Sequence, residues 1–181
     1  MKKILVVGAS GATGKLLVKD LLIRGAEVIA IVRSSSSLKH TFKSYPNYLE
    51  VSASITEMPE NELAAILVDC NVVLSCLGHN LDFRGMFGKP KRLVTDTIEK
   101  VSRVIELLRP DTRVRVILMN TTGNSNRDIP EKPPLSQRIV ISILRLILPP
   151  HVDNEQAGDF LRTYVGQRHS FIEWAAVRPD A

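Results

Sequence analysis

Residues 4–14 read Ile-Leu-Val-Val-Gly-Ala-Ser-Gly-Ala-Thr-Gly, and this stretch decides the expected fold of the chain. Its first four residues form a continuous aliphatic run, which is typical of a strand buried on both faces of a parallel sheet. The three glycines follow with the spacing GxxGxxG and stand directly before residues 15–24, where leucines recur at helical spacing. Strand, glycine loop and helix in this order predict the first unit of a parallel α/β sheet.

The alternation of strand and helix continues along the chain. Further strands are expected at 28–32, 48–51, 72–77, 114–119 and 172–177, and further helices at 57–68, 93–108, 135–148 and 154–168. The four serines at 34–37 predict the start of a short helix that runs to about Lys43. We therefore expect a three-layer Rossmann fold, in which a doubly wound parallel sheet carries helices on both faces. The 181 residues fit a single domain.

Charge is distributed unevenly along the chain. The net formal charge is +5, but residues 1–44 hold 8 basic and 2 acidic side chains, whereas residues 45–83 hold 6 acidic and no basic ones. The acidic stretch argues against a uniformly basic face for nucleic acid, while the basic first unit suits a ligand rich in phosphate. Nucleic acid is therefore not an expected partner.

The glycine loop predicts a phosphate-binding site. Gly8, Gly11 and Gly14 respectively allow a tight turn, a close approach of the backbone to a pyrophosphate and close packing of the helix on the strand. The N-terminus of the following helix directs free N–H groups at the same point. The expected dinucleotide contacts in the loop are Gly8, Ser10, Gly11, Ala12, Thr13 and Gly14.

The end of the second strand predicts which dinucleotide binds. An acidic residue at this place accepts from the ribose hydroxyl of NAD, and a basic residue accommodates the extra phosphate of NADP. The sequence has Arg33 here, followed by Ser34, whereas Glu27 lies at the opposite end of the strand. A planar guanidinium matches a phosphate, so NADP(H) is expected in preference to NAD(H). The alternative is an arginine that only covers the following helix.

With these motifs in place, the chain resembles the atypical branch of the short-chain dehydrogenases/reductases. The resemblance rests on the glycine motif, on the Val32-Arg33 strand end and on Ala176-Val177-Arg178-Pro179 in the last strand. The chain is similar to the NAD(P)H-binding group that contains NmrA-like regulators and biliverdin/flavin reductases. This likeness implies that Leu77 and Gly78 lie along the cofactor, and that Asn120, Thr121 and Thr122 face the nicotinamide. It also implies an adenine contact after the third strand, where Ser54 stands in place of the usual aspartate.

The sequence departs from the main branch of these enzymes in its catalytic residues. That branch uses a tyrosine and a lysine four residues later, but Tyr164 is followed at this spacing by Arg168, and no lysine occurs after Lys132. Candidate catalytic groups are instead Thr122, which could hydrogen-bond an acceptor, and His151 with Asp153, which stand just before the last helix. His79 is a further candidate at a strand's carboxyl end. The alternative for His151 is an exposed loop residue, and for Asp153 a helix cap.

Two further segments bear on partners. The apolar helix expected at 135–148 predicts a lid over the site or a contact with a second subunit or protein, in preference to a membrane-surface helix. The basic segment 84–92 is expected to be a solvated loop, with a flap over the nicotinamide as the alternative. No run reaches the ~20 apolar residues of a membrane span. Two cysteines six positions apart favour a reducing, cytoplasmic compartment.

These patterns lead to two hypotheses. The first is an NADP(H)-dependent reductase that transfers hydride to a flavin-like, quinone-like or other conjugated acceptor, which can take its proton from solvent. The second is a non-catalytic NADP(H)-binding sensor of the NmrA-like type. Since the chain ends directly after the sixth strand, we also expect it to lack a C-terminal segment that would cap the substrate.

Overall fold

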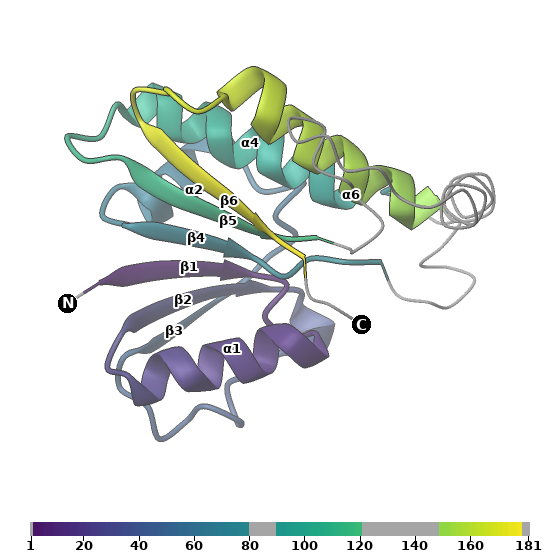
Figure 1. Cartoon of the computed structure of the whole chain (residues 1–181). Helices are drawn as coiled ribbons and strands as arrows, with labels where there is room; N and C mark the ends of the chain where they lie inside the picture. The colour runs from purple at the N-terminus through teal and green to yellow at the C-terminus, as the bar shows by residue number, and fades with distance from the viewer. Residues whose placement is uncertain (1, 80–89, 121–148, 179–181) are drawn as a thin grey trace.

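A computed structural model describes residues 2–79, 90–120 and 149–178. Their strands are all parallel and form one sheet in the order β3-β2-β1-β4-β5-β6 (Figure 1). The strands are β1 (Lys3–Val7), β2 (Glu27–Val32), β3 (Tyr48–Ser52), β4 (Val72–Ser75), β5 (Val114–Met119) and β6 (Ile172–Val177). The helical elements are α1 (Ala12–Ile23), η1 (Ser34–Ser36), α2 (Glu60–Leu67), α4 (Leu93–Leu108), α6 (Pro149–Phe160) and η2 (Leu161–Val165).

The strand order changes direction next to β1. From β1 the chain builds outward through β2 to β3, and then returns through α2 to place β4 on the other side of β1. Helix α1 covers one face of the sheet, while α2, α4 and α6 lie over the other (Figure 1). This arrangement confirms the predicted doubly wound α/β Rossmann fold. It also opens a crevice at the carboxyl ends of β1 and β4, where such sheets bind ligands.

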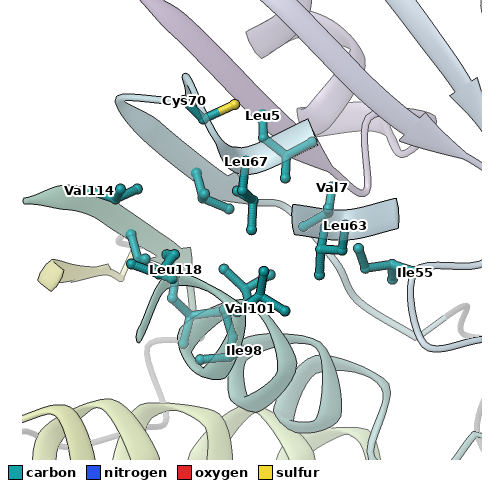
Figure 2. Packing of buried hydrophobic residues seen from close by; sticks show 14 of the residues in the cluster. Leu5, Val7, Ile55, Leu63, Leu67, Cys70, Ile98, Val101, Val114 and Leu118 are labelled. Carbon is teal, nitrogen blue, oxygen red and sulfur yellow. The ribbon is translucent and has the colours of Figure 1, made fainter. Parts of the chain in front are cut away.

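Successive side chains of β1 point to opposite faces of the sheet and belong to two separate hydrophobic cores. Leu5 and Val7 are buried in a cluster with α2 and α4, part of which Figure 2 shows, and Ile4 and Val6 are buried in a second cluster with α1. A strand buried on both faces needs apolar residues at every position, which explains the unbroken run before the glycine loop. The strand is therefore fixed from both sides, and so is the loop that follows it.

The helix predicted from the serine run is wrong. A single 3-10 turn spans Ser34–Ser36, and the chain then continues in turns to Tyr48. The cause is Glu50 on β3, whose carboxylate accepts from the Ser37 hydroxyl at 2.7 Å and from the Leu38 amide at 2.8 Å. An amide bound to a side chain in this way leaves the helical hydrogen-bond pattern.

Three helices differ from their predicted bounds. Helix α1 begins at Ala12, because the glycine loop closes tightly enough for its last residues to join the first turn. Helix α2 begins after Pro59, which occupies its N-cap position. Helix α6 begins at Pro149 and passes into a π-helical turn that ends at Gly166, whose φ of 66° is left-handed. The helix predicted at 135–148 lies outside the described residues.

Candidate functional site

A cleft of about 620 Å³ lies in the crevice at the carboxyl ends of β1, β2 and β4. It brings together nine of the residues predicted to bind a dinucleotide: Gly8, Ser10, Gly11, Ala12, Thr13, Arg33, Ser54, Leu77 and Gly78. The basic residues among its described lining residues are Lys15, Arg33 and His79, and no Asp or Glu is among them. A cleft of this size, lined by basic side chains, suits a polyanionic ligand.

The glycine loop has the close packing that its sequence predicts. Gly8 has a φ of +78°, and a Cβ atom there would lie 2.5 Å from the carbonyl carbon of Cys76. A Cβ atom on Gly14 would lie 2.2 Å from the carbonyl oxygen of Gly8. Gly14 therefore supports the loop from below and is not among the residues that line the cleft. Both positions require glycine for reasons that are independent of any ligand.

The N-terminus of α1 is open to an anion. Its N-cap residue is Gly11, so no side chain caps the helix, and its first turn contains no acidic residue. The N–H groups at this end carry a partial positive charge, and Gly8 and Gly11 in the adjoining loop have no Cβ atom that would keep a ligand away. The residues present therefore fit the diphosphate of a dinucleotide.

Arg33 lies at the exposed end of β2, beside the part of the cleft lined by Ser36, Ser37 and Leu38. Glu50 holds this segment in place from β3, as described above, and accepts a further hydrogen bond from the Tyr48 hydroxyl at 2.8 Å. Burial acts to raise the pKa of Glu50, but hydrogen bonds from Ser37, Tyr48 and Leu38 outweigh it, and the pKa is lowered. The Glu50 carboxylate is thus occupied by hydrogen bonds to the loop after β2. The sequence did not predict this role, because Glu50 has the pattern of an ordinary strand residue.

A second support that the sequence did not reveal is Lys100 on α4. Its ammonium group donates to the carbonyl oxygens of Ile55 at 3.1 Å and Thr56 at 3.0 Å, and also to that of Met58. The lysine thereby closes the turn after β3, which lines the cleft around Ser54. The Ser54 hydroxyl is itself hydrogen-bonded to that of Thr56, at 3.1 Å.

His79, which lines the cleft, forms a buried pair with Asp153, which does not. His79 follows β4 and lines the cleft, and its Nε2 lies 2.8 Å from Oδ2 of Asp153. The Asp153 carboxylate also accepts from the backbone amides of Val94 at 2.8 Å and Thr95 at 3.0 Å, and from the Thr95 hydroxyl at 2.6 Å. Asp153 therefore caps the N-terminus of α4, a helix other than its own, and it stands behind His79 relative to the cleft.

This environment sets the charge of Asp153. Burial acts to raise the pKa of the carboxyl, but the hydrogen bonds from His79, Thr95 and Val94 outweigh it, so the pKa lies below its ordinary value. A carboxyl whose pKa is lower in the folded than in the unfolded state stabilises the fold above the unfolded value of about 3.9, and this contribution is lost as the pH falls through the folded value.

Replacing Asp153 by asparagine is therefore expected to lower the free energy of unfolding by about 1–3 kcal/mol at pH 7, because strong acceptors for three neighbours are weakened. The difference from the unmodified protein should shrink as the pH falls from 4 to 2, as measured by urea unfolding. Asp96→Asn is the matched control, since burial raises the pKa of Asp96 in the first turn of the same helix. An Asp153→Asn deficit that is equally large at pH 2.5 and pH 7 would contradict this assignment.

The other predicted site residues lie off the cleft or outside the described part. Asn120 is buried and its side-chain amide donates to the Asn154 carbonyl at 3.2 Å. His151 is also buried, with Nε2 3.4 Å from Oε1 of Glu155. Ser34 begins η1. Thr121 and Thr122 are not among the described residues, nor is most of the segment 84–92.

No tyrosine is found among the described residues that line the cleft. Tyr45 and Tyr48, the first residue of β3, pack around Phe42, and Tyr164 stacks on Phe160 with ring centroids 4.9 Å apart. In the same described residues no three His, Cys, Asp or Glu side chains are arranged to hold a metal ion. Nor do the helices found there include one long and apolar enough to cross a membrane.

Fold and site together define a dinucleotide-binding Rossmann domain. A family model described as NAD(P)H-binding matches residues 8–181, and the chain belongs to this family. A chloroplastic protein of Arabidopsis thaliana, named as uncharacterized, is 41% identical over 75 residues, which are 41% of this chain and 26% of the relative.

Solved structures share the fold at low identity. The enzyme WbmH of Bordetella bronchiseptica, in complex with NAD⁺, superposes with a TM-score of 0.67 at 18% identity, over 98% of this chain and 55% of that one. A proposed NADH-flavin reductase from Streptococcus pneumoniae superposes with a TM-score of 0.60 at 21% identity, over 99% of this chain and 72% of that one. The chain therefore spans about a quarter of the Arabidopsis protein and about half of WbmH.

Proposed function

We propose that this protein is an NADP(H)-dependent oxidoreductase of the atypical short-chain dehydrogenase type, which transfers hydride to a flavin-like, quinone-like or other conjugated acceptor. The observation that carries the proposal is the cleft itself, which joins a glycine loop, an uncapped helix N-terminus and Arg33 along one wall. When bound, the cofactor supplies the hydride, and the protein supplies binding and orientation.

Different residues along the cleft would bind different parts of the dinucleotide. The backbone of Gly8 to Thr13 and the N-terminus of α1 hold the diphosphate, while the turn around Ser54 takes the adenine end. Leu77 and Gly78 follow the carboxyl end of β4 and line the cleft, where they would contact the nicotinamide half. Asn120, Thr121, Thr122 and His151 stay predictions for the acceptor side.

The preference for NADP(H) rests on charge at the end of β2. Arg33 supplies a cation there, and Lys15 supplies another on α1. Glu27 is at the opposite end of the same strand, and Glu50 is already bound to the loop. A phosphate on the ribose would therefore meet a guanidinium, with no described cleft-lining carboxylate to repel it.

The proposed class of hydride acceptor depends on which proton donors line the cleft. The described lining residues include no tyrosine that could act as the usual proton donor. Flavin-like and quinone-like acceptors delocalise the charge left by hydride, so they depend less on a strong acid than a simple ketone does. The S. pneumoniae structural neighbour, whose name is that of a flavin reductase, is in keeping with this choice.

The same observation supports a second candidate, a non-catalytic NADP(H) sensor with a protein partner. A cleft that binds the dinucleotide without a tyrosine donor would serve such a role, and the segment 135–148 would be its contact surface or that of a homodimer. We assign the protein to the cytoplasm on the basis of its free thiols, Cys70 and Cys76. A chloroplast, named for the Arabidopsis relative, is the competing location.

Turnover separates the two candidates. The purified chain is mixed with NADPH and either FMN or menadione, and the loss of NADPH absorbance is followed with and without protein. We expect oxidation that saturates with NADPH and is stimulated by at least one acceptor. Tight NADPH binding with no protein-dependent oxidation would reject the reductase and favour the sensor.

A further inference from the structure

One pair of side chains in the cleft has a role that binding alone does not require. His79 lines the cleft, yet 94% of its side chain is buried, and Asp153 behind it is 1% exposed at its side chain. The two residues are 74 positions apart in the chain. His79 therefore connects the ligand cleft to the Asp153 carboxylate, to which it is hydrogen-bonded.

The hydrogen bonds around Asp153 determine which nitrogen of His79 carries a proton. Oδ1 accepts from the amide and the hydroxyl of Thr95, and Oδ2 accepts from the amide of Val94. An ionised carboxylate can only accept, so the Nε2 atom of His79 at 2.8 Å from Oδ2 must donate. The Nε2–H form of the ring is thereby fixed, and a second proton on Nδ1 makes an imidazolium that the carboxylate stabilises.

We propose that protonated His79 is the proton donor of the reduction, and that Asp153 is the residue that positions it. This inference rests on the proposed reductase function. The dihydronicotinamide gives one hydride, and thus two electrons, to the acceptor, and His79 gives one proton from Nδ1, directly or through a group hydrogen-bonded to it. The acceptor gains two hydrogens in total, NADPH becomes NADP⁺, and neutral His79 regains its proton from water.

The charges around the pair favour the protonated form of His79, which is the form that can donate. Asp153 is the carboxylate in contact with the ring. Its negative charge also acts on Asp96 in the first turn of α4, where burial, together with the neighbouring acids, raises the pKa of the Asp96 carboxyl. On α6 the neighbouring titratable groups are His151 and Glu155, which contact each other. Lys15 and Arg33 are the other charged groups among the described lining of the cleft. A diphosphate bound to Lys15 and Arg33 would neutralise their positive charge, which otherwise disfavours the imidazolium form of His79.

The pairing itself can be tested without turnover. In long-range ¹H–¹⁵N spectra of the protein without cofactor, we expect neutral His79 to show the Nε2–H pattern. The carboxyl ¹³C shift of Asp153 should titrate at higher pH in His79→Gln than in the unmodified protein, because a hydrogen bond that lowers the pKa of Asp153 is weakened. An Nδ1–H pattern for His79 would overturn the proposal.

The catalytic role is tested with His79→Gln, whose amide can still donate to Asp153 but cannot transfer a proton. At saturating NADPH with menadione or FMN, we expect kcat to fall about tenfold, less than the 10²–10⁴ typical of general acids, because these acceptors also take protons from solvent. The dissociation constant of NADPH should change less than about twofold. The matched control is His169→Gln, which removes a histidine paired with Glu106 at 3.0 Å, outside the lining of this cleft.

The positioning role of Asp153 has its own readout. The activity of the unmodified protein should fall as rising pH removes the proton from His79, and in Asp153→Asn this fall should occur at lower pH. A purely structural residue would change the amount of folded protein and leave the profile in place. Unchanged kcat in His79→Gln, with turnover in the unmodified protein, overturns this role alone. Absence of turnover in the unmodified protein overturns the reductase function as well.

Discussion

Replacing Gly8 by alanine is expected to lower the free energy of unfolding by about 2–5 kcal/mol and to abolish dinucleotide binding. Two costs add at this position. The left-handed φ of +78° disfavours any residue with a Cβ by about 1–2 kcal/mol, and the new atom would lie 2.5 Å from the Cys76 carbonyl carbon. Overpacking of this kind costs about 1–3 kcal/mol, and here it presses on backbone that cannot change rotamer. Urea unfolding and an NADPH titration measure the two effects.

Gly25→Ala is the matched control for this variant. Gly25 has the same φ of +78°, but a Cβ atom there would meet nothing within 4 Å. Its substitution should therefore cost only the backbone term of about 1–2 kcal/mol and leave NADPH binding intact. Equal losses in the two variants would show that the contact with the β4 loop is unimportant, and the description of the glycine loop as closely packed would then be wrong.

Replacing Arg33 by alanine is expected to weaken NADPH binding about 100-fold, corresponding to roughly 2.7 kcal/mol, and NADH binding less than threefold. The reason is that a guanidinium at the end of β2 meets the ribose phosphate, which NADH lacks. Calorimetric titration of both reduced cofactors against the variant and the unmodified protein gives the two ratios. The NADPH affinity of Arg33→Lys should lie between that of the unmodified protein and that of Arg33→Ala, because lysine keeps the charge but lacks the planar pair of donors.

Arg24→Ala controls for the loss of one positive charge. Arg24 is exposed and bound to Asp20 at 2.7 Å, and it is not among the residues that line the cleft. Its removal should leave both affinities unchanged. A result in which Arg33→Ala weakens NADPH and NADH by the same factor would mean that Arg33 does not read the phosphate.

The parts of the fold that depend on short-range pattern could be predicted from the sequence. The strands at 114–119 and 172–177 and the helix at 93–108 have the predicted bounds. The glycine loop was predicted for the same reason, because its three glycines, the preceding strand and the following helix are consecutive. The order of the strands in the sheet was not itself predicted; the prediction extended only to a doubly wound parallel sheet.

Supports from distant residues could not be predicted. Glu50 captures the loop after β2 from 12 and 13 positions away, Lys100 reaches the turn after β3 across 42 to 45 positions, and Asp153 caps α4 across 58 and 59. Each is a polar residue whose local pattern predicts only a strand or helix surface. Each of them also binds at least one backbone group, which any sequence supplies, so nothing in the composition marks that pairing.

Calorimetric titration of the unmodified protein with NADPH and with NADH tests the proposed NADP(H) site most directly. We expect NADPH to bind at one site per chain and at least tenfold more tightly than NADH, because the glycine loop and Arg33 line the same cleft. Binding of neither nucleotide, or an equal affinity for both, would contradict the proposed NADP(H) site.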